Sequence, residues 1–373
     1  MKEVMNKLFG KYYIVSYGTL GKYLYDFFKS DTNLCFMGFL DNIKTGENVF
    51  RPEIIIDKDS IAVIASINYM YDLTHQLKAL GFKNVITFAD LTLMYPELQN
   101  FNQAFLGLKE DYKNNKEKYE QVRNILADEK SKEVLDTIIE FRKTYNIDLY
   151  SKIADDINRE YFEDFMPKDE KIFIDGGAFD GDTVLRAVNC GYKFEKIYFF
   201  EPDKNSLSKA KENLKDFSNI KYLPYGISDK NKVLNFDSNG TFGSHFSEAG
   251  EDSIECVSLD DTVKEDRAFI KLDIEGAEIE AINGAKRLLK NGSPFAICVY
   301  HKPEDIWKIP ELLLNIIYGK TLDNSVACLE ALNYATTQLQ SLKQFCTEDL
   351  DYKFFLRHYT NTIFDTILYG VPK

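Results

Sequence analysis

The sequence predicts an α/β protein with two parallel sheets, the second of them doubly wound and closed by an antiparallel hairpin. Short apolar runs alternate with amphipathic segments in two separate stretches of the chain, which is typical of parallel sheets covered by helices. Between these stretches, charged residues dominate and apolar residues recur at helical spacing. We therefore expect a small α/β domain over residues 1–95, a helical connector over 96–165 and a larger α/β domain over 166–373.

In the small domain, each apolar run is short enough for a strand and leads into a turn or a helical stretch. Gly18 and Gly21 bracket the first turn, and Gly81 ends the second helical stretch. The predicted strands cover residues 12–16, 35–40, 61–66 and 85–88. The predicted helices cover residues 22–29 and a stretch that ends at Leu80.

The connector is predicted to be helical because its apolar residues keep a helical spacing, as Val134, Leu135, Ile138 and Ile139 do. The tetrapeptide Pro-Lys-Asp-Glu at residues 167–170 then separates it from the large domain. Helices of this kind are compatible with a homodimer contact, which the sequence leaves open.

The large domain repeats the strand–helix alternation and then ends with two apolar runs in succession. Strands are predicted at residues 171–174, 197–200, 220–224, 269–272 and 295–300, and the closing hairpin at 352–358 and 365–369. Helices are predicted at residues 183–190 and 205–214, and from near Glu278 to about Gly292. Ligands of a doubly wound sheet bind at the carboxyl ends of the strands, so the functional residues are expected directly after them.

The composition narrows the classes of function. The 373 residues carry a formal net charge of −13, which argues against a nucleic acid or an anionic membrane surface as the main partner, because both are bound by clustered Lys and Arg. The six cysteines are widely spaced, so neither a disulfide framework nor a zinc site is expected. The sequence shows no signal peptide and no membrane span. We expect a cytoplasmic protein that acts on a small molecule or a glycan.

The sequence Asp-Gly-Gly-Ala-Phe-Asp-Gly at residues 175–181 follows a predicted strand, and Glu201 ends the next one. A glycine turn lets the backbone approach a ligand, and an acidic residue at this distance can accept hydrogen bonds from ribose hydroxyls. A dinucleotide site normally shows G-x-G-x-x-G, whereas Asp175 and Asp180 suit the ammonium and sulfonium groups of S-adenosylmethionine. Alternatively, Asp180 or Asp182 merely caps the following helix. The predicted cofactor-binding residues are Asp175, Gly176, Gly177, Phe179, Asp180, Glu201, Pro202 and Asp273.

Residues 175–181, the tripeptide Phe200-Glu201-Pro202 and the element Lys-Leu-Asp-Ile-Glu-Gly-Ala-Glu at 271–278 resemble the FkbM-type methyltransferases. The resemblance runs from about Tyr161 to the C-terminus and includes residues 259–261. It implies a Rossmann-like methyltransferase fold and O-methylation, often of sugars or sugar-bearing natural products.

A loop at residues 243–247 also resembles the Ser-rich loop of that family, which lies near the cofactor and the acceptor. Ser244 and His245 are therefore predicted to contact the substrate. Residues 318–348 resemble an insertion between the fifth strand and the closing hairpin, which leaves the acceptor open.

Transfer of a methyl group to a hydroxyl requires a base, because the hydroxyl must lose its proton. Asp273 and His301 end adjacent predicted strands and are the candidates, and Glu275 is expected to orient the hydroxyl. In a second interpretation, the carboxylates around Asp273 hold a divalent cation that lowers the pKa of the hydroxyl. In a third, Glu275 and Glu278 only complement the dipole of a helix. Glu278 and Arg357 are further predicted substrate contacts.

The small domain carries a shortened glycine motif, Tyr-Gly-Thr-Leu-Gly at residues 17–21, with Asp41 at the end of the next strand. It is similar to the Rossmann-like domain that precedes some bacterial sugar acetyltransferases. A scaffold or substrate-presenting role, a sugar-nucleotide site and an NAD site all stay open for it.

Three functions are compared. The favoured one is an S-adenosylmethionine-dependent O-methyltransferase of a sugar, glycan or sugar-nucleotide precursor, as in polysaccharide biosynthesis. The second is a nicotinamide-linked sugar-nucleotide oxidoreductase that uses the small domain, and it is weakened because no Tyr-x-x-x-Lys pair follows Asp41. The third is a non-catalytic binding module, which is weakened because the acidic and glycine positions of the cofactor site are intact.

Overall fold

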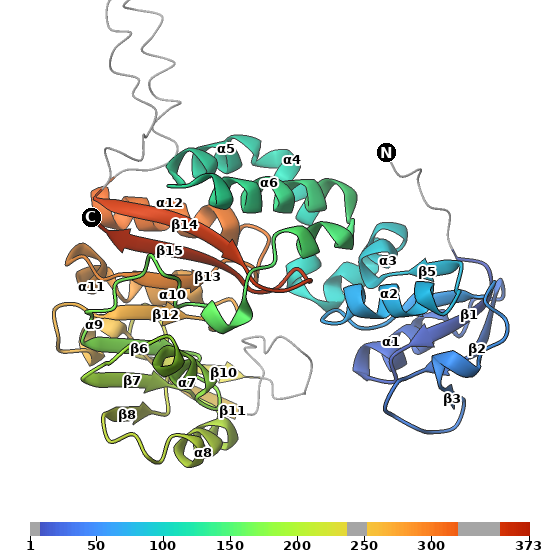
Figure 1. Ribbon diagram of the computed structural model, residues 1–373, viewed down its shortest axis with the longest axis horizontal. Coiled ribbons are helices and arrows are strands. Elements are labelled where there is room, and N and C mark those ends of the chain that lie inside the picture. Colours follow the sequence, from blue (N-terminus) through green and yellow to red (C-terminus); the bar gives the residue numbers. More distant parts are fainter. Residues whose placement is uncertain (1–7, 237–251, 320–350) are drawn as a thin grey trace, which may run out of the picture. The chain divides into compact units, whose positions relative to one another are not determined.

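The computed structural model describes residues 8–236, 252–319 and 351–373 (Figure 1). The chain forms two compact units, each assembled from separate stretches of sequence. Unit 1 comprises Met1–Lys109, Thr137–Ala154 and Thr360–Phe364. Unit 2 comprises Glu110–Asp136, Asp155–Tyr359 and Asp365–Lys373. Residues 96–165, which the sequence analysis treats as a connector, thus contribute to both units.

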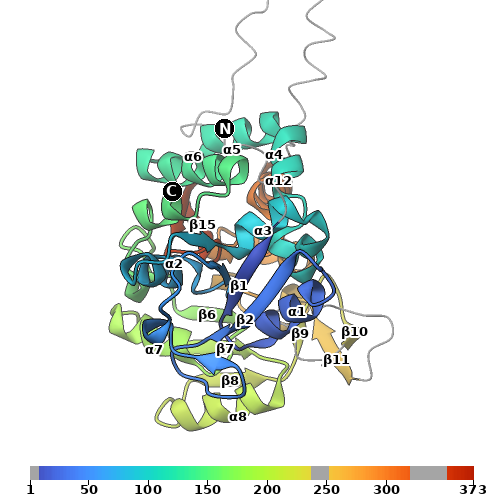
Figure 2. The same cartoon turned by 90° about the vertical axis from the view of Figure 1, so that its right-hand side faces the viewer.

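Unit 1 is built on a five-stranded parallel sheet with the strand order β3-β2-β1-β4-β5. Figure 2 shows the neighbouring strands β1 and β2 of this sheet. The strands are β1 (Gly10–Val15), β2 (Leu34–Leu40), β3 (Val49–Phe50), β4 (Ile61–Ile64) and β5 (Asn84–Ile86). The helices are α1 (Thr19–Phe28), α2 (Met70–Ala79) and α3 (Phe88–Met94), with a 3₁₀ turn at Pro52–Ile54. The central strand β1 is buried from Tyr12 to Val15, as expected for a parallel sheet.

The segment after α3 is helical, as its apolar spacing predicts. It contains α4 (Leu108–Asn114), α5 (Lys116–Ile125) and α6 (Glu129–Thr144), and 3₁₀ turns at Pro96–Phe101, Gln103–Phe105, Ile147–Lys152 and Ile157–Arg159. Val134, Leu135 and Ile138 of α6 are buried. The boundary between the two units falls within α6, after Asp136.

Unit 2 contains a seven-stranded sheet with the order β14-β15-β13-β12-β6-β7-β8. Strands β13, β12, β6, β7 and β8 are parallel, and β15 and β14 close the sheet as an antiparallel hairpin. The strands are β6 (Ile172–Gly176), β7 (Lys196–Phe200), β8 (Ile220–Leu223), β12 (Phe269–Leu272), β13 (Phe295–Cys298), β14 (Tyr352–His358) and β15 (Thr366–Pro372). The doubly wound sheet and closing hairpin that the sequence predicts are therefore confirmed.

The helices of unit 2 that follow β6 lie between these strands in sequence (Figure 1). They are α7 (Asp182–Asn189), α8 (Lys204–Asn213), α9 (Leu259–Thr262), α10 (Glu278–Asn283), α11 (Lys286–Lys290) and α12 (Asp305–Tyr318). Because β6, β7, β12 and β13 are parallel, their carboxyl ends meet at one edge of the sheet, where ligands of such folds bind.

A second, three-stranded sheet of unit 2 was not predicted. Its strands are β9 (Gly226–Ile227), β10 (Lys232–Phe236) and β11 (Asp252–Val257), in the order β10-β11-β9. The predicted substrate residues Ser244 and His245 fall between β10 and β11, outside the residues that the structure describes. Most of the predicted insertion at 318–348 also lies outside them.

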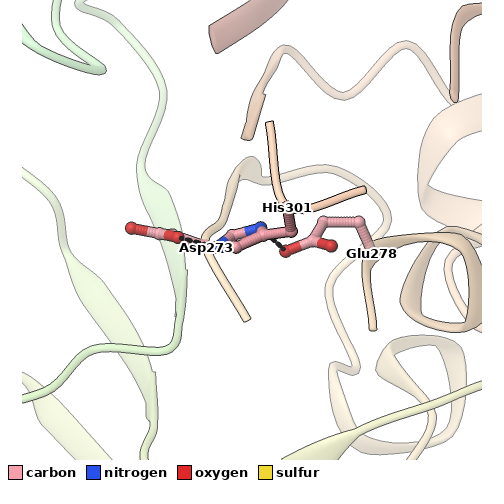
Figure 3. Close-up of side chains that lie close together, drawn as sticks. All are labelled: Asp273, Glu278 and His301. Carbon is pink, nitrogen blue, oxygen red and sulfur yellow. Dashed lines mark ion pairs between the residues drawn. The ribbon is translucent and has the colours of Figure 1, made fainter. Parts of the chain in front are cut away.

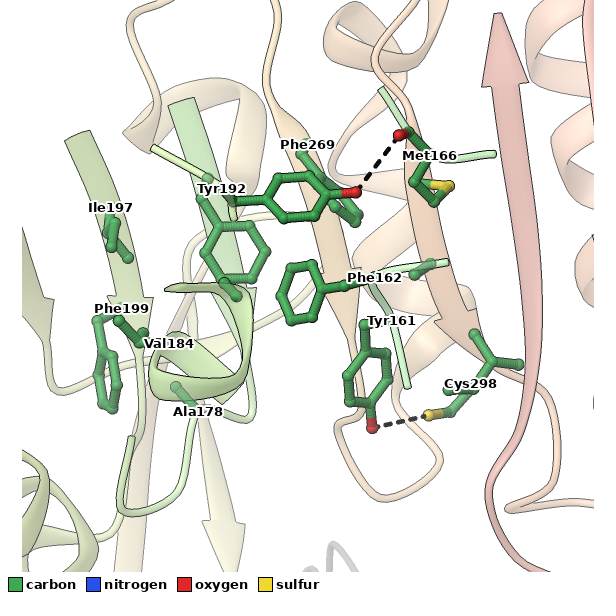
Figure 4. Packing of buried hydrophobic residues seen from close by; sticks show 14 of the residues in the cluster. Tyr161, Phe162, Met166, Ala178, Val184, Tyr192, Ile197, Phe199, Phe269 and Cys298 are labelled. Carbon is green, nitrogen blue, oxygen red and sulfur yellow. Dashed lines mark hydrogen bonds between the residues drawn. The ribbon is translucent and has the colours of Figure 1, made fainter. Parts of the chain in front are cut away.

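A cluster of buried aromatic side chains packs against the large sheet, and it includes Tyr161, whose hydroxyl is polar (Figure 4). The ring of Phe162 lies 5.8 Å from that of Phe173 and 5.7 Å from that of Phe269, measured between centroids. All three rings are buried, and burial of such a side chain stabilises the fold by about 1.5–3 kcal/mol. The hydroxyl of the neighbouring Tyr161 lies 3.8 Å from Sγ of Cys298. The core therefore fixes a phenol near the carboxyl end of β13.

Candidate active site

The turn after β6 lies directly against the end of β12. Gly177 has a φ of +70°, which favours glycine, and a Cβ atom at this position would lie 1.8 Å from the carbonyl oxygen of Asp273. The N–H groups of Gly177 and Ala178 both donate to the carbonyl oxygen of Phe200, at 3.1 Å. The turn is thus fixed between two strands, and a ligand bound on it lies beside the backbone of Asp273.

Glu201 holds this turn from the end of β7. Its Oε2 accepts a hydrogen bond from the N–H of Phe179 at 2.9 Å, and its Oε1 accepts one from the N–H of Asp203 at 2.8 Å. Burial raises the pKa of Glu201, and the two N–H groups oppose this rise. Pro202 lies between Glu201 and Asp203 in the sequence. Phe179 is 56% exposed. Each carboxylate oxygen keeps a lone pair with which it can bind a ligand.

Asp175 and Lys271 form a buried ion pair beneath the same turn. The Lys271 ammonium lies 3.2 Å from Oδ1 of Asp175 and donates hydrogen bonds to the carbonyl oxygens of Gly176 and Gly177, at 3.1 and 2.8 Å. Burial alone would lower the pKa of Lys271, but the charges of Asp175 and Asp273 hold it above its ordinary value. The sequence analysis named Asp175 but not Lys271, although a lysine within an apolar strand was a usable signal.

Asp180 lies beyond the turn, at the start of the segment that leads into α7. Its carbonyl oxygen accepts a hydrogen bond from the Asn213 side chain at 3.0 Å. The N-cap residue of α7 is Gly181, and no side chain caps this helix end. Asp182 is in the first turn of α7, where its carboxylate pairs with Arg186 at 3.4 Å. The alternative that Asp180 or Asp182 caps α7 is therefore wrong.

Asp273 directly follows β12, and its carboxylate accepts hydrogen bonds from two tyrosine hydroxyls. Oδ2 accepts a hydrogen bond from Tyr161 at 3.0 Å, and Oδ1 accepts one from Tyr300 at 3.1 Å. Burial alone would raise the pKa of Asp273, but the charges of Lys271 and His301, with the two hydroxyls, lower it. Neither tyrosine was named from the sequence, because nothing in their own segments shows which carboxylate they meet.

The His301 imidazole lies between carboxylates that face different ring nitrogens (Figure 3). Nδ1 lies 3.1 Å from Oε1 of Glu278, whereas Nε2 lies 3.4 Å from Oδ1 of Asp273 and 3.7 Å from Oε2 of Glu275. Burial alone would lower the pKa of His301, but these three carboxylates raise it to about 10. The three carboxylates therefore favour the protonated ring, and His301 can act as a base only after one ring nitrogen has lost its proton.

Glu275 and Glu278 belong to the same short segment but differ in exposure. The Glu275 side chain is 66% exposed and its backbone has a φ of +55°, whereas the Glu278 side chain is 1% exposed. Oε1 of Glu278 also accepts a hydrogen bond from the N–H of Ile274 at 2.9 Å. Of the two glutamates, Glu275 is therefore the one that can reach a ligand directly.

The described residues include one group of three whose positions could suit a metal ion, Asp273, Glu278 and His301. One potential ligand atom from each lies within 4.8 Å of the others. In their ion pairs with His301, Glu278 lies nearer Nδ1 and Asp273 lies nearer Nε2. The distances are those of ion pairs around a charged imidazole.

The predicted substrate contact Arg357 is buried in β14 and already has partners. Its guanidinium lies 2.6 Å from Oδ2 of Asp128, and it donates hydrogen bonds to Oγ of Ser131 at 2.8 Å and to the carbonyl oxygen of Leu356 at 2.9 Å. These contacts join β14 to the start of α6. The next residue, His358, is fully buried, with Nδ1 2.8 Å from the Thr366 hydroxyl.

Backbone strain is concentrated around the site. Among the described residues of unit 2, the non-glycine residues with positive φ are Tyr161, Phe179, Glu275 and Asp365. Tyr161, Phe179 and Glu275 lie beside Asp273, Glu201 and His301, as described above. The fourth, Asp365, interacts through its carboxylate with Tyr300 and Asp273. Such conformations cost about 1–3 kcal/mol each and cluster at functional sites.

Comparisons with known proteins agree with this geometry. Residues 175–334 match the model of the methyltransferase FkbM domain. The 2-O-methyltransferase NoeI of Sinorhizobium fredii (strain NBRC 101917 / NGR234) is 26% identical over an alignment of 149 residues that covers 33% of this chain and 61% of that protein. The crystal structure of methyltransferase FkbM from Methylobacillus flagellatus KT has the same fold, with a TM-score of 0.72 and 19% identity over 96% of this chain and 89% of that one.

In fold and in the matched domain, this chain is therefore similar to methyltransferases. More particularly, the matched residues lie in its second unit and are similar to the methyltransferase FkbM domain. Within the part of the chain that the structure describes, no helix is long and apolar enough to cross a membrane.

Proposed function

We propose that the protein is an S-adenosylmethionine-dependent O-methyltransferase whose acceptor is a hydroxyl of a sugar, glycan or sugar-nucleotide precursor. One observation carries this proposal: the glycine turn held by Glu201 directly contacts Asp273, whose carboxylate is 3.4 Å from His301. A cofactor on the turn and an acceptor at Asp273 would therefore share one edge of the sheet. The 2-O-methyltransferase named above supports oxygen as the methylated atom.

The residues present fit this cofactor. Gly177 lets the turn lie directly against the backbone of Asp273, and Glu201 keeps lone pairs for ribose hydroxyls. The exposed ring of Phe179 lies next to the turn and offers an apolar surface. Asp175 is fully buried against Lys271, so we assign it to shaping the turn and to the negative potential beneath it. The cofactor, when bound, supplies a methyl group on a positively charged sulfur.

The residues of this chain then position the acceptor and receive its proton. With the cofactor bound, these residues would orient the acceptor hydroxyl toward the methyl group, and one of them would take up the proton that the hydroxyl loses. Alignment of the reacting groups can contribute about 7–11 kcal/mol, and a placed base typically adds about 10²–10⁴ in rate. Asp273 and His301 are our candidates for the base, with Glu275 orienting the hydroxyl from its exposed position.

A role for Ser244 and His245 in acceptor binding stays a prediction from the sequence. For unit 1, we propose a scaffold or substrate-presenting role. The Asp41 carboxylate accepts hydrogen bonds from the backbone N–H groups of Tyr17, Ile43 and Lys44, at 2.8, 2.8 and 2.7 Å. It therefore already holds its own loop together, which favours a scaffold over a dinucleotide site.

Calorimetric titration with S-adenosylmethionine tests the proposal. We expect nucleoside-free wild-type protein to bind with a dissociation constant on the order of micromolar, and Glu201→Ala to weaken binding at least about tenfold. Glu195→Ala is the matched control, because that side chain is 65% exposed and pairs with Lys171. Circular dichroism of each variant checks that the fold is kept.

The same titration repeated in EDTA tests the cation interpretation. Because the carboxylates pair with His301, we expect binding to be unchanged. A wild-type protein that fails to bind the cofactor, with and without added Mg²⁺, would overturn the proposed function.

A further inference from the structure

We propose that Tyr161 is a positioning residue, which fixes the Asp273 carboxylate as the group that meets the positive charge of the cofactor. The site thereby binds S-adenosylmethionine, the charged methyl donor, in preference to S-adenosylhomocysteine, whose sulfur is neutral. This inference rests on the proposed function and adds to it a residue that acts on the cofactor only through Asp273.

The Tyr161 side chain reaches Asp273 from inside the core. Tyr161 is 3% exposed, and its hydroxyl donates to Oδ2 of Asp273 at 3.0 Å. Oδ1 of the same carboxylate accepts a hydrogen bond from the hydroxyl of Tyr300 at 3.1 Å. Hydrogen bonds to a charged acceptor are roughly twice as strong as those between neutral groups. Because each oxygen has its own donor, the carboxylate cannot rotate without breaking a strong hydrogen bond.

The backbone of Tyr161 is itself held in place. It has a φ of +67°, and its N–H donates to the hydroxyl of Tyr369 at 3.0 Å. The Tyr369 hydroxyl lies 2.5 Å from that of Tyr359, which donates to Oε1 of Glu163 at 2.7 Å. This buried chain of polar groups supports a conformation that a residue with a side chain rarely adopts. Strain that a fold retains in this way is typical of functional positions.

The ring of Tyr161 also contacts two cations. The Lys271 ammonium lies 5.2 Å from the ring centroid, and the Arg186 guanidinium lies 5.9 Å from it. Each cation pairs with a carboxylate of its own, Asp175 for Lys271 and Glu160 for Arg186. Their charges are therefore largely balanced without Asp273. The contacts depend on the ring alone, so they remain when only the hydroxyl is removed.

The charge around Asp273 favours a cation. The single His301 ring is shared by three carboxylates, those of Asp273, Glu275 and Glu278, so this group is negative overall even when the ring is charged. Of the three, Asp273 is the one whose backbone lies directly against the glycine turn at Gly177. Its side chain is 25% exposed, so a ligand on the turn can reach it. A carboxylate held there attracts a positive charge and gains little from a neutral sulfur.

Calorimetric titration of full-length Tyr161→Phe with two nucleosides tests this inference. S-adenosylmethionine and S-adenosylhomocysteine differ by one methyl group and its positive charge, so the ratio of their dissociation constants isolates that difference. We expect Tyr161→Phe to weaken binding of the first about three- to tenfold and to change binding of the second less than about twofold. Sinefungin, which carries an amine in place of the methyl sulfonium, should follow S-adenosylmethionine because the site responds to charge.

Tyr192→Phe is the matched control. Tyr192 belongs to the same buried cluster, but its hydroxyl donates to the carbonyl oxygen of Met166 at 3.4 Å (Figure 4). The ratio should therefore keep its wild-type value in this variant. Asp273→Asn removes the charge itself and should reduce the preference for S-adenosylmethionine at least about tenfold. If Tyr161→Phe does not fold, Tyr300→Phe removes the other hydroxyl and should reduce the preference in the same direction.

The outcomes separate a positioning role from a structural one. An equal loss of affinity for both nucleosides in Tyr161→Phe is the result of a damaged site and overturns the inference. An unchanged ratio in the folded variant overturns it as well, although the wild type still binds both nucleosides and the proposed function stands. A wild-type protein that binds neither nucleoside instead overturns the proposed function, and the inference with it.

Discussion

Gly177 shows how a single position can join the two halves of the candidate site. Its backbone has a φ of +70°, and the space that a Cβ would need is already taken by the carbonyl oxygen of Asp273. Any larger residue must therefore displace either the glycine turn or the end of β12. Both displacements would change the distance between the cofactor turn and the Asp273 carboxylate.

We expect Gly177→Ala to destabilise the protein by about 2–4 kcal/mol, because steric displacement adds to the cost of positive φ. Urea unfolding measures this change, and cofactor binding should weaken in parallel. Gly191→Ala is the control, since Gly191 has a φ of +85° with no atom within 4 Å of the added Cβ. If the free energy of unfolding falls equally in the two variants, the contact with Asp273 does not contribute to stability.

The residues of the site were predictable to different degrees. Asp175, Glu201, Asp273 and His301 were found because each directly follows a strand in the sequence. The hydrogen bond from Tyr161 to Asp273 joins residues 112 apart, so it depends on how the strand order closes in space. Sequence patterns that lie within one strand and its turn carry no information on such a pair.

At the scale of elements, β14 is the edge strand of the large sheet and is partly covered. Leu126 forms a parallel bridge to Phe354, and the N–H of Ala127 donates to the carbonyl oxygen of Phe354 at 2.8 Å. The Ser131 hydroxyl then accepts from the N–H of Leu356 at 2.9 Å. These contacts satisfy backbone hydrogen-bonding groups of β14 that could otherwise pair with a strand of another chain.

The ion pair between Asp128 and Arg357 holds the segment after α5 against β14. It also makes the stability of the fold depend on pH. Burial alone would raise the pKa of Asp128, but Arg357 and Ser131 lower it below its ordinary value. A carboxylate with a lowered pKa stabilises the fold above the pKa of the unfolded chain, about 4, and this stabilisation is lost as the pH falls through the lower, folded value.

We therefore expect Asp128→Asn to lower stability by about 1–3 kcal/mol at pH 7, because it leaves the Arg357 charge buried without its partner. The low end is favoured because the Asp128 side chain is 36% exposed. Urea unfolding from pH 7 down to pH 3 measures this. The difference from the wild type should shrink below pH 4, whereas Asp136→Asn, in an exposed pair with Arg123, should change little at any pH.

The elements themselves were largely predictable, and the exceptions have a physical reason. Strands β6, β7 and β12 are continuous apolar runs, since both faces of a central parallel strand are buried. Strands β9, β10 and β11 are short or mixed in polarity, so they lack such a signal. The segment at 96–165 shows helical spacing, but nothing in that spacing reveals that its residues belong to two units.

For the whole molecule, the division into two units predicts which unit a bound cofactor would stabilise. Trp307 is the only tryptophan of the chain and lies in α12 of unit 2, where its Nε1 donates to Oδ1 of Asp111 at 3.1 Å. Its fluorescence therefore reports unfolding of the unit that carries the candidate site.

At a concentration of S-adenosylmethionine about one hundred times its dissociation constant, we expect the unfolding free energy reported by Trp307 to rise by about 2.7 kcal/mol. Hydrogen exchange should slow in peptides from β6 and β7 and stay unchanged in peptides from β1 and β2. Protection confined to β1 and β2 would instead assign the cofactor to the turn at Gly18 and Gly21.

The ion pair between Asp175 and Lys271 also sets an order of events during synthesis. Lys271 bonds to the carbonyl oxygen of Gly176 across a separation of 95 residues. At about 5–20 residues per second, the ribosome delivers this lysine roughly 5–20 s after the turn that it supports. Until then the nascent chain has an acidic group with no cation beneath its turn. A cofactor that binds this turn would therefore meet the complete site only after Lys271 has been made.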